Sequence, residues 1–186
     1  MEIQTFTKSH IHLAHALWLP FLAQGGLFID ATAGNGCDAL FIAEKGLHCP
    51  LDHLHLFDIQ EKALENSRKR CLPYLSQITF HHKSHLQLPD IRAQLIVYNL
   101  GYLPNGGDNT LTTETETTLK SVKEGIKRLK KGGALSITCY PGHEEGAREE
   151  RALCSFFKNQ PDLKVSFYKK QNRSLAPSLL FIRHLA

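Results

Sequence analysis

Short apolar runs alternate with longer amphipathic stretches along this chain of 186 residues. Seven apolar runs have the length of β-strands and are bounded by glycine, proline or polar residues: residues 27–30, 53–58, 78–82, 94–99, 134–140, 164–168 and 178–183. Amphipathic stretches predict helices over residues 9–24, 37–45, 61–72, 113–130 and 144–159. Strands that alternate with helices are typical of a parallel sheet that helices cover on both faces.

The last two predicted strands differ from the others because no helix separates them. We therefore expect them to pair antiparallel, joined by a loop that contains Gln171-Asn172-Arg173. The whole pattern predicts an α/β, Rossmann-like fold: a seven-stranded, mostly parallel sheet that ends in an antiparallel hairpin, with helices on both faces. The chain has no repeat or linker, so we expect one domain over residues 1–186, with residues 1–25 as an N-terminal helical extension.

Composition and the N-terminus predict a cytoplasmic globular protein. Hydrophobic residues make up 42% of the chain and charged residues 22%, which is ordinary for a folded domain. No apolar run approaches the roughly 18–20 residues that a membrane span needs, and the N-terminus lacks the pattern of a secretory signal. The five cysteines are scattered and form no C-x-x-C pair, which argues against a disulfide framework or a cysteine-based zinc site.

The net charge of +4 is a weak indication of an anionic partner. Basic residues gather in two places, at residues 68–70 and 120–131. Each cluster is either a surface that contacts RNA or a solvated helix face, because the helix dipole stabilises Lys and Arg near a helix C-terminus. The sequence leaves both interpretations open.

A glycine-containing segment, Asp-Ala-Thr-Ala-Gly-Asn-Gly at residues 30–36, follows the first predicted strand and opens a helix. Gly34 and Gly36 let the backbone turn sharply and approach a ligand closely. Asp58 ends the next strand, where a carboxylate can accept hydrogen bonds from both ribose hydroxyls of a nucleoside. Ligands bind at the carboxyl edge of open α/β sheets, so the pattern predicts a cofactor that contains a nucleoside.

These signals alone do not decide which cofactor binds, because Gly34-x-Gly36-x-x-Ala39 also fits the fingerprint of nicotinamide-dependent enzymes. Three features favour S-adenosylmethionine. Asp30 lies where methyltransferases carry an acidic residue that helps to hold the ammonium group of the methionine end. The terminal hairpin is the layout of class I methyltransferases, and the third feature is the segment after the fourth strand.

That segment reads Asn-Leu-Gly-Tyr-Leu-Pro at residues 99–104. Asn99-x-x-Tyr102 has the spacing of the N-P-P-Y motif of methyltransferases that act on nitrogen. An amine nucleophile needs hydrogen-bond acceptors that aim its lone pair at the methyl group, and the side-chain oxygen of Asn99 is such an acceptor. Tyr102 can stack on a planar base, an interaction worth roughly 1–3 kcal/mol. The simpler alternative is that Asn99 caps a turn at the end of a strand.

Together these motifs resemble a family of bacterial methyltransferases, also labelled rRNA methylases, that methylate the aminomethyl group of 5-aminomethyl-2-thiouridine at the tRNA wobble position. The resemblance spans residues 28–146 and rests on collinear segments at 30–36, 57–60, 82–85, 99–104, 106–108 with 112–113, and 140–143. The chain departs from the family at Asn105, which stands before the two glycines, and at Asn109, which replaces a usual Lys.

The resemblance implies an S-adenosylmethionine-dependent N-methyltransferase with tRNA as its partner. The residues that would contact the cofactor, besides Asp30 and the two glycines, are Asn35, Asp58, Gln60, Ser84 and His85. Asn99, Tyr102 and His143 would line the substrate end. His143 is either a general base or a residue exposed at the start of a helix. The tRNA would dock on the surface of the catalytic domain itself, and a homodimer is one arrangement that this leaves open.

Eleven histidines, several of them at residues 53–55 and 81–85, raise the question of a metal site. The chain lacks a helical H-x-x-x-H with a third ligand at a suitable offset, so we expect no metal. Other functions remain open from the sequence: methylation of another RNA or of a small-molecule amine, a nicotinamide-dependent oxidoreductase, and a non-catalytic nucleotide-binding module.

Overall fold

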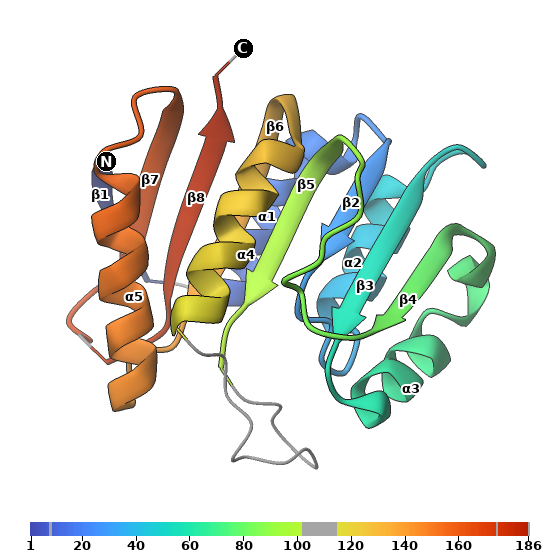
Figure 1. Ribbon diagram of the computed structural model, residues 1–186, viewed down its shortest axis with the longest axis horizontal. Coiled ribbons are helices and arrows are strands. Elements are labelled where there is room, and N and C mark those ends of the chain that lie inside the picture. The colour runs from blue at the N-terminus through green and yellow to red at the C-terminus, as the bar shows by residue number, and fades with distance from the viewer. Residues whose placement is uncertain (8, 102–114, 174, 186) are drawn as a thin grey trace.

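The computed structural model describes residues 1–7, 9–101, 115–173 and 175–185, which form one mixed sheet between two layers of helices (Figure 1). The eight strands in these residues are β1 Glu2–Phe6, β2 Leu27–Asp30, β3 His53–Asp58, β4 Ile78–His82, β5 Ala93–Asn99, β6 Leu129–Cys139, β7 Leu163–Lys170 and β8 Ser178–His184. Their order across the sheet is β1-β7-β8-β6-β5-β2-β3-β4. The α-helices are α1 His10–Leu22, α2 Cys37–Gly46, α3 Glu61–Arg70, α4 Thr115–Arg128 and α5 Glu144–Phe157, and a 3-10 helix, η1, spans Leu72–Gln77. Within the described ranges no helix is both long and apolar enough to cross a membrane.

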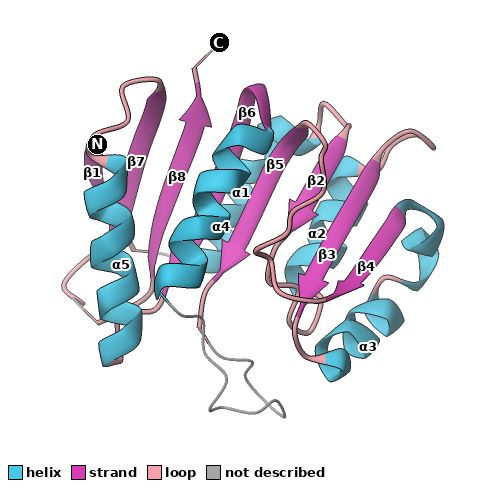
Figure 2. Ribbon diagram, viewed as in Figure 1, coloured by secondary structure: helices cyan, strands magenta, loops and turns pink. Residues whose placement is uncertain are grey.

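The predicted architecture is confirmed in its main features. Strand β8 is antiparallel to both β6 and β7, whereas the other pairs of neighbouring strands are parallel. Figure 2 shows α4 and α5 on one face of the sheet and α1 and α2 on the other. Strand β5 supplies both cores, because successive side chains of a strand point to opposite faces. Leu95 and Val97 pack on the α1–α2 face, and Ile96 and Tyr98 pack on the α4–α5 face.

The prediction of seven strands was wrong by one. Residues 2–6, which were expected to belong to a helical extension, form β1 and pair in parallel with β7, with Gln4 opposite Tyr168. The segment Glu-Ile-Gln-Thr-Phe is short and mostly exposed, and only Phe6 is buried. Its partner strand is distant in the sequence, so local periodicity gave no sign of the pairing. The predicted N-terminal helix is present as α1.

The turn after β2 is bonded to the strands on both sides of it. The backbone N–H of Ala31 donates to the carbonyl of Val97 in β5 over 2.9 Å. The backbone N–H of Ala33 donates to the carbonyl of Phe57 in β3 over 2.8 Å. The turn is therefore held at a fixed place on the carboxyl edge of the sheet.

Gly36 ends this turn and starts α2. Its φ of +77° lies in the left-handed region, where a side chain is strained. Space is also short, because a Cβ at Gly36 would lie 2.7 Å from the Cα of Ser67 in α3. The hydroxyl of Ser67 donates to the carbonyl of Gly34 over 3.0 Å. The glycine turn and α3 therefore pack against each other directly.

Gly36→Ala should destabilise the fold more than the same change at Gly132, which has a φ of +76° but nothing within 4 Å of its Cβ position. Gly132→Ala carries only the left-handed backbone penalty, roughly 1–2 kcal/mol. Gly36→Ala adds a clash with the backbone of Ser67, and overpacking costs about 1–3 kcal/mol more. Urea unfolding of both variants measures the difference. Equal losses would show that α3 moves away from the turn without cost.

Candidate active site

Three polar side chains lie at the carboxyl edge of the sheet, each at the end of a parallel strand. Asp30 ends β2, Asp58 ends β3 and Asn99 ends β5. They come together because β2 lies between β5 and β3. Strands β3 and β4 follow β2 on one side, and β5 and β6 continue the sheet on the other. Open α/β sheets bind their ligands where the strand order reverses in this way.

Asp30 is buried, with 1% of its surface exposed, and only part of its carboxylate is satisfied. Its Oδ1 accepts a hydrogen bond from the backbone N–H of Thr32 over 3.1 Å. Its Oδ2 is buried and has no hydrogen-bond partner among the described residues. Burial, and then the charge of Asp38, raise the pKa of Asp30 well above its usual value. A cation placed beside Oδ2 would stabilise the ionised carboxylate.

Asp58 holds the glycine turn and the start of α3. Its Oδ2 accepts from the backbone N–H of Gly34 and its Oδ1 from that of Gln60, each over 2.9 Å. Burial raises the pKa of Asp58, and these backbone N–H groups act against that rise. Asn35, between the two glycines, is also tied to α3: its side-chain oxygen accepts from Asn66 over 2.9 Å.

The carboxamide of Asn99 is oriented by a partner on each side. Its Nδ2 donates to Oδ2 of Asp38 in α2 over 3.4 Å. Its Oδ1 accepts from the hydroxyl of Tyr140, the residue after β6, over 2.8 Å. The backbone N–H of Asn99 donates to the hydroxyl oxygen of Thr32 over 2.6 Å. These bonds place the amide nitrogen toward Asp38 and the amide oxygen toward Tyr140.

Helix α1 supports both partners of Asn99. His15 Nε2 lies 2.7 Å from Oδ1 of Asp38, and the imidazole stacks on Phe41 with ring centroids 3.8 Å apart. His10 Nε2 lies 3.3 Å from the hydroxyl of Tyr140. His10, His15 and Asp38 were not predicted as site residues. Tyr140 belongs to one of the segments that carry the family resemblance, but no local pattern in the sequence indicates that these side chains meet.

Ser84 and His85 lie in the connection between β4 and β5. The hydroxyl oxygen of Ser84 accepts from the backbone N–H of Leu86 over 3.4 Å. His85 is buried, and its ring meets the ring of Tyr98 edge-on, with centroids 5.6 Å apart. Burial lowers the pKa of His85 to about 4, so the imidazole is neutral at physiological pH. Its Nδ1 has no hydrogen-bond partner among the residues described.

His143 is the N-cap of α5. Its Nδ1 accepts from the backbone N–H of Gly146 over 3.1 Å, so the neutral ring carries its proton on Nε2. The ring can therefore take up a proton only after this capping bond breaks. Tyr102, the other residue expected at the substrate end, lies outside the described residues, as do Asn105 and Asn109.

Three histidines of the sequence clusters, His53, His55 and His81, lie together on β3 and β4, whereas Nε2 of His82 lies 3.1 Å from the carbonyl of Ile59. Nδ1 of His55 and Nε2 of His81 are 3.0 Å apart, and Nε2 of His53 lies 2.8 Å from the hydroxyl of Thr79. Burial, followed by the charges of the neighbouring histidines, lowers the pKa of His55 to about 4. In the part of the chain that the structure describes, no group of three or more His, Cys, Asp or Glu side chains is arranged to hold a metal ion.

The fold and the residues at the carboxyl edge of the sheet define the class of protein. A mostly parallel sheet with one antiparallel strand, a glycine turn after β2 and acidic residues at the ends of β2 and β3 is the arrangement of class I methyltransferases. The crystal structure of a "putative rRNA-methylase" from Clostridium thermocellum matches with a TM-score of 0.89 and 28% identity, covering 97% of this chain and 100% of that one. A "putative methyltransferase" from Streptococcus mutans, solved in complex with SAH, matches with a TM-score of 0.80, 28% identity and the same coverage.

The chain belongs to the family described as "Putative rRNA methylase", which matches residues 54–184. A curated relative is the tRNA (mnm(5)s(2)U34)-methyltransferase, chloroplastic, of Arabidopsis thaliana. It is 31% identical over an alignment of 192 residues that covers 94% of this chain and 69% of the relative. The chain is therefore a methyltransferase, and not the oxidoreductase or the non-catalytic module that the sequence left open.

Binding of S-adenosylhomocysteine (SAH), which keeps the amino group of the cofactor, should release a proton from Asp30. Burial raises the pKa of this carboxyl group in the free protein. An ammonium bound beside it would lower the pKa in the complex. Affinity should therefore rise as the pH rises toward the free-protein pKa of Asp30, and should fall again only at alkaline pH, where the ligand amine itself deprotonates. Titration calorimetry in two buffers of different ionisation enthalpy measures the released proton.

Asp30→Asn is the matched control, because it keeps the shape and removes the titration. This variant should bind SAH more weakly and release fewer protons on binding. We assign any pH dependence of the SAH affinity that remains to Asp58. Wild-type binding without proton release would mean that Asp30 does not meet the ammonium group.

Proposed function

We propose that this chain methylates the amine nitrogen of 5-aminomethyl-2-thiouridine at the wobble position of tRNA. The observation that carries the proposal is the oriented carboxamide of Asn99 at the carboxyl edge, between Asp38 and Tyr140. The name of the Arabidopsis relative, which specifies U34 of tRNA, supports the choice of substrate.

The cofactor is S-adenosylmethionine, and the described residues fit it. The unpaired, buried Oδ2 of Asp30 suits an ammonium group. The carboxylate of Asp58 keeps lone pairs beside those that accept from Gly34 and Gln60, and these suit ribose hydroxyls. The residues that we assign to the cofactor are Asp30, Gly34, Asn35, Gly36, Asp58, Gln60, Ser84 and His85.

The charge of the site also suits this cofactor. Asp38 and Asp58 each add to the rise in the pKa of Asp30, because their charges interact electrostatically with its carboxylate. Mutual repulsion between carboxylates is relieved by a cation, and S-adenosylmethionine carries both an ammonium and a sulfonium. Bound S-adenosylmethionine supplies a methyl group on sulfonium, which is an excellent leaving group. The protein then has to position the nucleophile more than to activate it.

Asn99 performs that positioning in our proposal. A carboxamide oxygen has two lone pairs, so Oδ1 can accept from the substrate amine while it accepts from Tyr140. Asp38 binds the Nδ2 side and keeps the amide from turning over. When the substrate amine donates a hydrogen bond to Oδ1, that bond fixes the direction of the nitrogen lone pair. Tyr102 would stack on the base, as the motif predicts.

The amine must be neutral when it attacks, and the product ammonium must then lose a proton. His143 lies at the start of α5, soon after Tyr140, and is our candidate acceptor. Its Nδ1 is occupied by Gly146, so it takes the proton only if the cap opens. Water is the other acceptor, and in that case His143 serves the site by fixing α5.

Asn99→Ala should lower the rate of single-turnover methyl transfer to tRNA about a hundredfold, because it removes the group that aims the amine. SAH affinity should stay close to that of the wild type. Tyr140→Phe should lower the rate less, because it removes one of the bonds that orient Asn99 but keeps the carboxamide itself. Asn159→Ala, at an exposed position after α5, is the matched control and should behave as wild type. An Asn99→Ala enzyme with unchanged single-turnover rate would overturn the proposal.

A further inference from the structure

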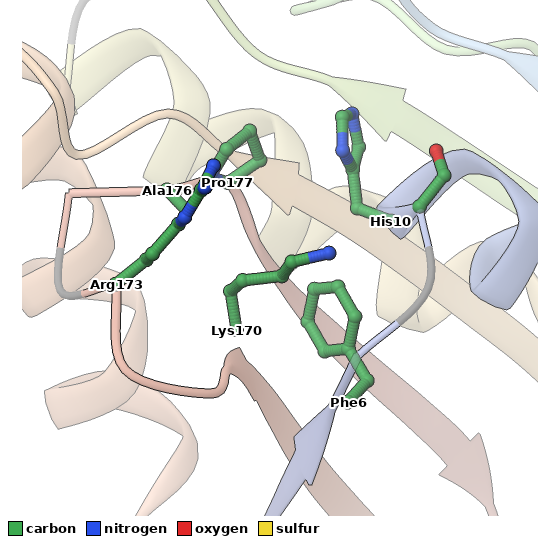
Figure 3. A pocket seen from close by; sticks show the side chains of 7 residues that line it. Phe6, His10, Lys170, Arg173, Ala176 and Pro177 are labelled. Atoms are coloured by element: carbon green, nitrogen blue, oxygen red, sulfur yellow. The ribbon is translucent and has the colours of Figure 1, made fainter.

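A small cavity opens at the same edge of the sheet as Asn99, on the side away from Asp30 and Asp58. It lies where β1 and β7 end, where α1 begins and where the connection from β7 to β8 passes (Figure 3). Its volume is about 180 Å³, and its lining residues are Phe6, Ser9, His10, Lys170, Arg173, Ala176 and Pro177. The strand order places β6 and β5 between this cavity and the β2–β3 half of the edge.

The side chains that line the cavity give it a positive charge. Figure 3 shows the side chain of Lys170 between Phe6 and His10, with Arg173 on the opposite wall. The lining contains no acidic residue, and neither does the first turn of α1. Burial lowers the pKa of His10, the charge of Asp38 acts against this, and the charge of Lys170 lowers the pKa by a smaller amount. The cavity therefore attracts anions.

The wall that carries the two cations is held in place by the chain around it. The backbone N–H of Gln171 donates to the carbonyl of Phe6 over 3.0 Å, which joins the end of β7 to the end of β1. Asn172 has a φ of +57° and reverses the chain. The backbone N–H of Arg173 then donates to the carbonyl of Lys170 over 3.4 Å. Lys170 and Arg173 are thus brought to one cavity by a specific turn.

His10 connects the cavity to the candidate active site. It lines the cavity, and its Nε2 lies 3.3 Å from the hydroxyl of Tyr140, which in turn donates to Asn99 over 2.8 Å. A substrate whose amine meets Asn99 has the cofactor residues on one side. The cationic cavity lies on the other side, where the rest of that substrate can extend.

We propose that this cavity is an anion subsite that binds a backbone phosphate of the RNA whose base is methylated. The inference rests on the proposed function and adds the place where the RNA backbone is held. Pockets that enclose whole small-molecule ligands measure about 300–1,000 Å³, so a cavity of about 180 Å³ suits one phosphate group better than a nucleotide. A second hollow of about 520 Å³, formed by residues 172–173 and 175–177, adjoins it at Arg173 and has room for the neighbouring part of the strand.

The basic residues of α4 are less suited to this role. Lys120 pairs with Glu116 and Lys127 with Glu124, each over 2.7 Å, so part of their charge is compensated. The last turn of α4 leads directly into Leu129, which pairs with Ala93 at the start of β5. That turn therefore lies at the edge of the sheet opposite to Asn99.

The test uses charge-neutral variants of the two cavity cations, with a matched variant at the opposite edge. Arg173→Gln is the main variant, because Arg173 is exposed and lies outside the strands and helices. Lys170→Gln is the second, with its stability checked by urea unfolding, since Lys170 also donates to the carbonyl of Thr7. Arg183→Gln is the control, because exposed Arg183 lies near the end of the antiparallel strand β8 and pairs with Lys164 near the start of β7.

Each cavity variant should raise the KM for tRNA about tenfold at moderate salt and leave kcat and SAH affinity close to wild type. The slope of log affinity against log salt should fall by about 0.7–0.9 for each phosphate contact that is lost. Arg183→Gln should change none of these values. A tRNA anticodon stem-loop with one neutral methylphosphonate at the contacted phosphate should reproduce the loss in the wild type and make Arg173→Gln silent.

The two proposals fail in different ways. A wild-type enzyme that methylates tRNA, with both cavity variants indistinguishable from Arg183→Gln, would overturn the phosphate subsite and leave the proposed function standing. A wild-type enzyme that neither binds nor methylates tRNA would overturn the proposed function and the subsite together.

Discussion

Two backbone hydrogen bonds, from Ala31 to Val97 and from Ala33 to Phe57, tie the turn after β2 to the strands on either side of it. The rest of the site depends on these two bonds. They fix the glycine turn over the carboxyl edge and bring Asp30 beside the ends of β3 and β5. Because these are bonds of the main chain, strand order and register set the place of the turn, and the side chains of Asp58 and Ser67 fix it further by bonding to Gly34.

The edge of the sheet is divided by charge. Asp30 at the end of β2, Asp58 at the end of β3 and Asp38 at the start of α2 make one half acidic. Burial raises the pKa of Asp30, and the charges of Asp38 and Asp58 raise it further, which suits a cofactor with an ammonium and a sulfonium. Lys170 and Arg173 make the other half basic, which suits a phosphodiester backbone. Asn99 lies between the two halves, and α1 reaches both of its partners through His15 and His10. The N-terminal helix is therefore part of the site, although the sequence indicated only an extension ahead of the first strand.

Most of the fold could be predicted because its signals are local. Apolar runs and glycine or proline residues bound most elements within a few residues, and the rule that parallel strands align their carboxyl ends brought Asp30, Asp58 and Asn99 together. Strand β1 was missed because its short, exposed sequence is recognisable only beside β7. The partners of Asn99 were missed for a related reason: Asp38 and Tyr140 are 61 and 41 positions away, and periodicity does not report which side chains meet across the fold. Similarly, a histidine at a helix start does not reveal that its Nδ1 accepts from Gly146.

In the proposed reaction, Asn99 directs a methyl group to the aminomethyl nitrogen of a tRNA base. The most direct measurement is mass spectrometry of the nucleosides of tRNA that lacks the final methylation, after incubation with the enzyme and isotope-labelled S-adenosylmethionine. We expect the label in 5-methylaminomethyl-2-thiouridine, on the methylamino group. Label on a ribose oxygen, on a ring carbon or in another nucleoside would contradict it.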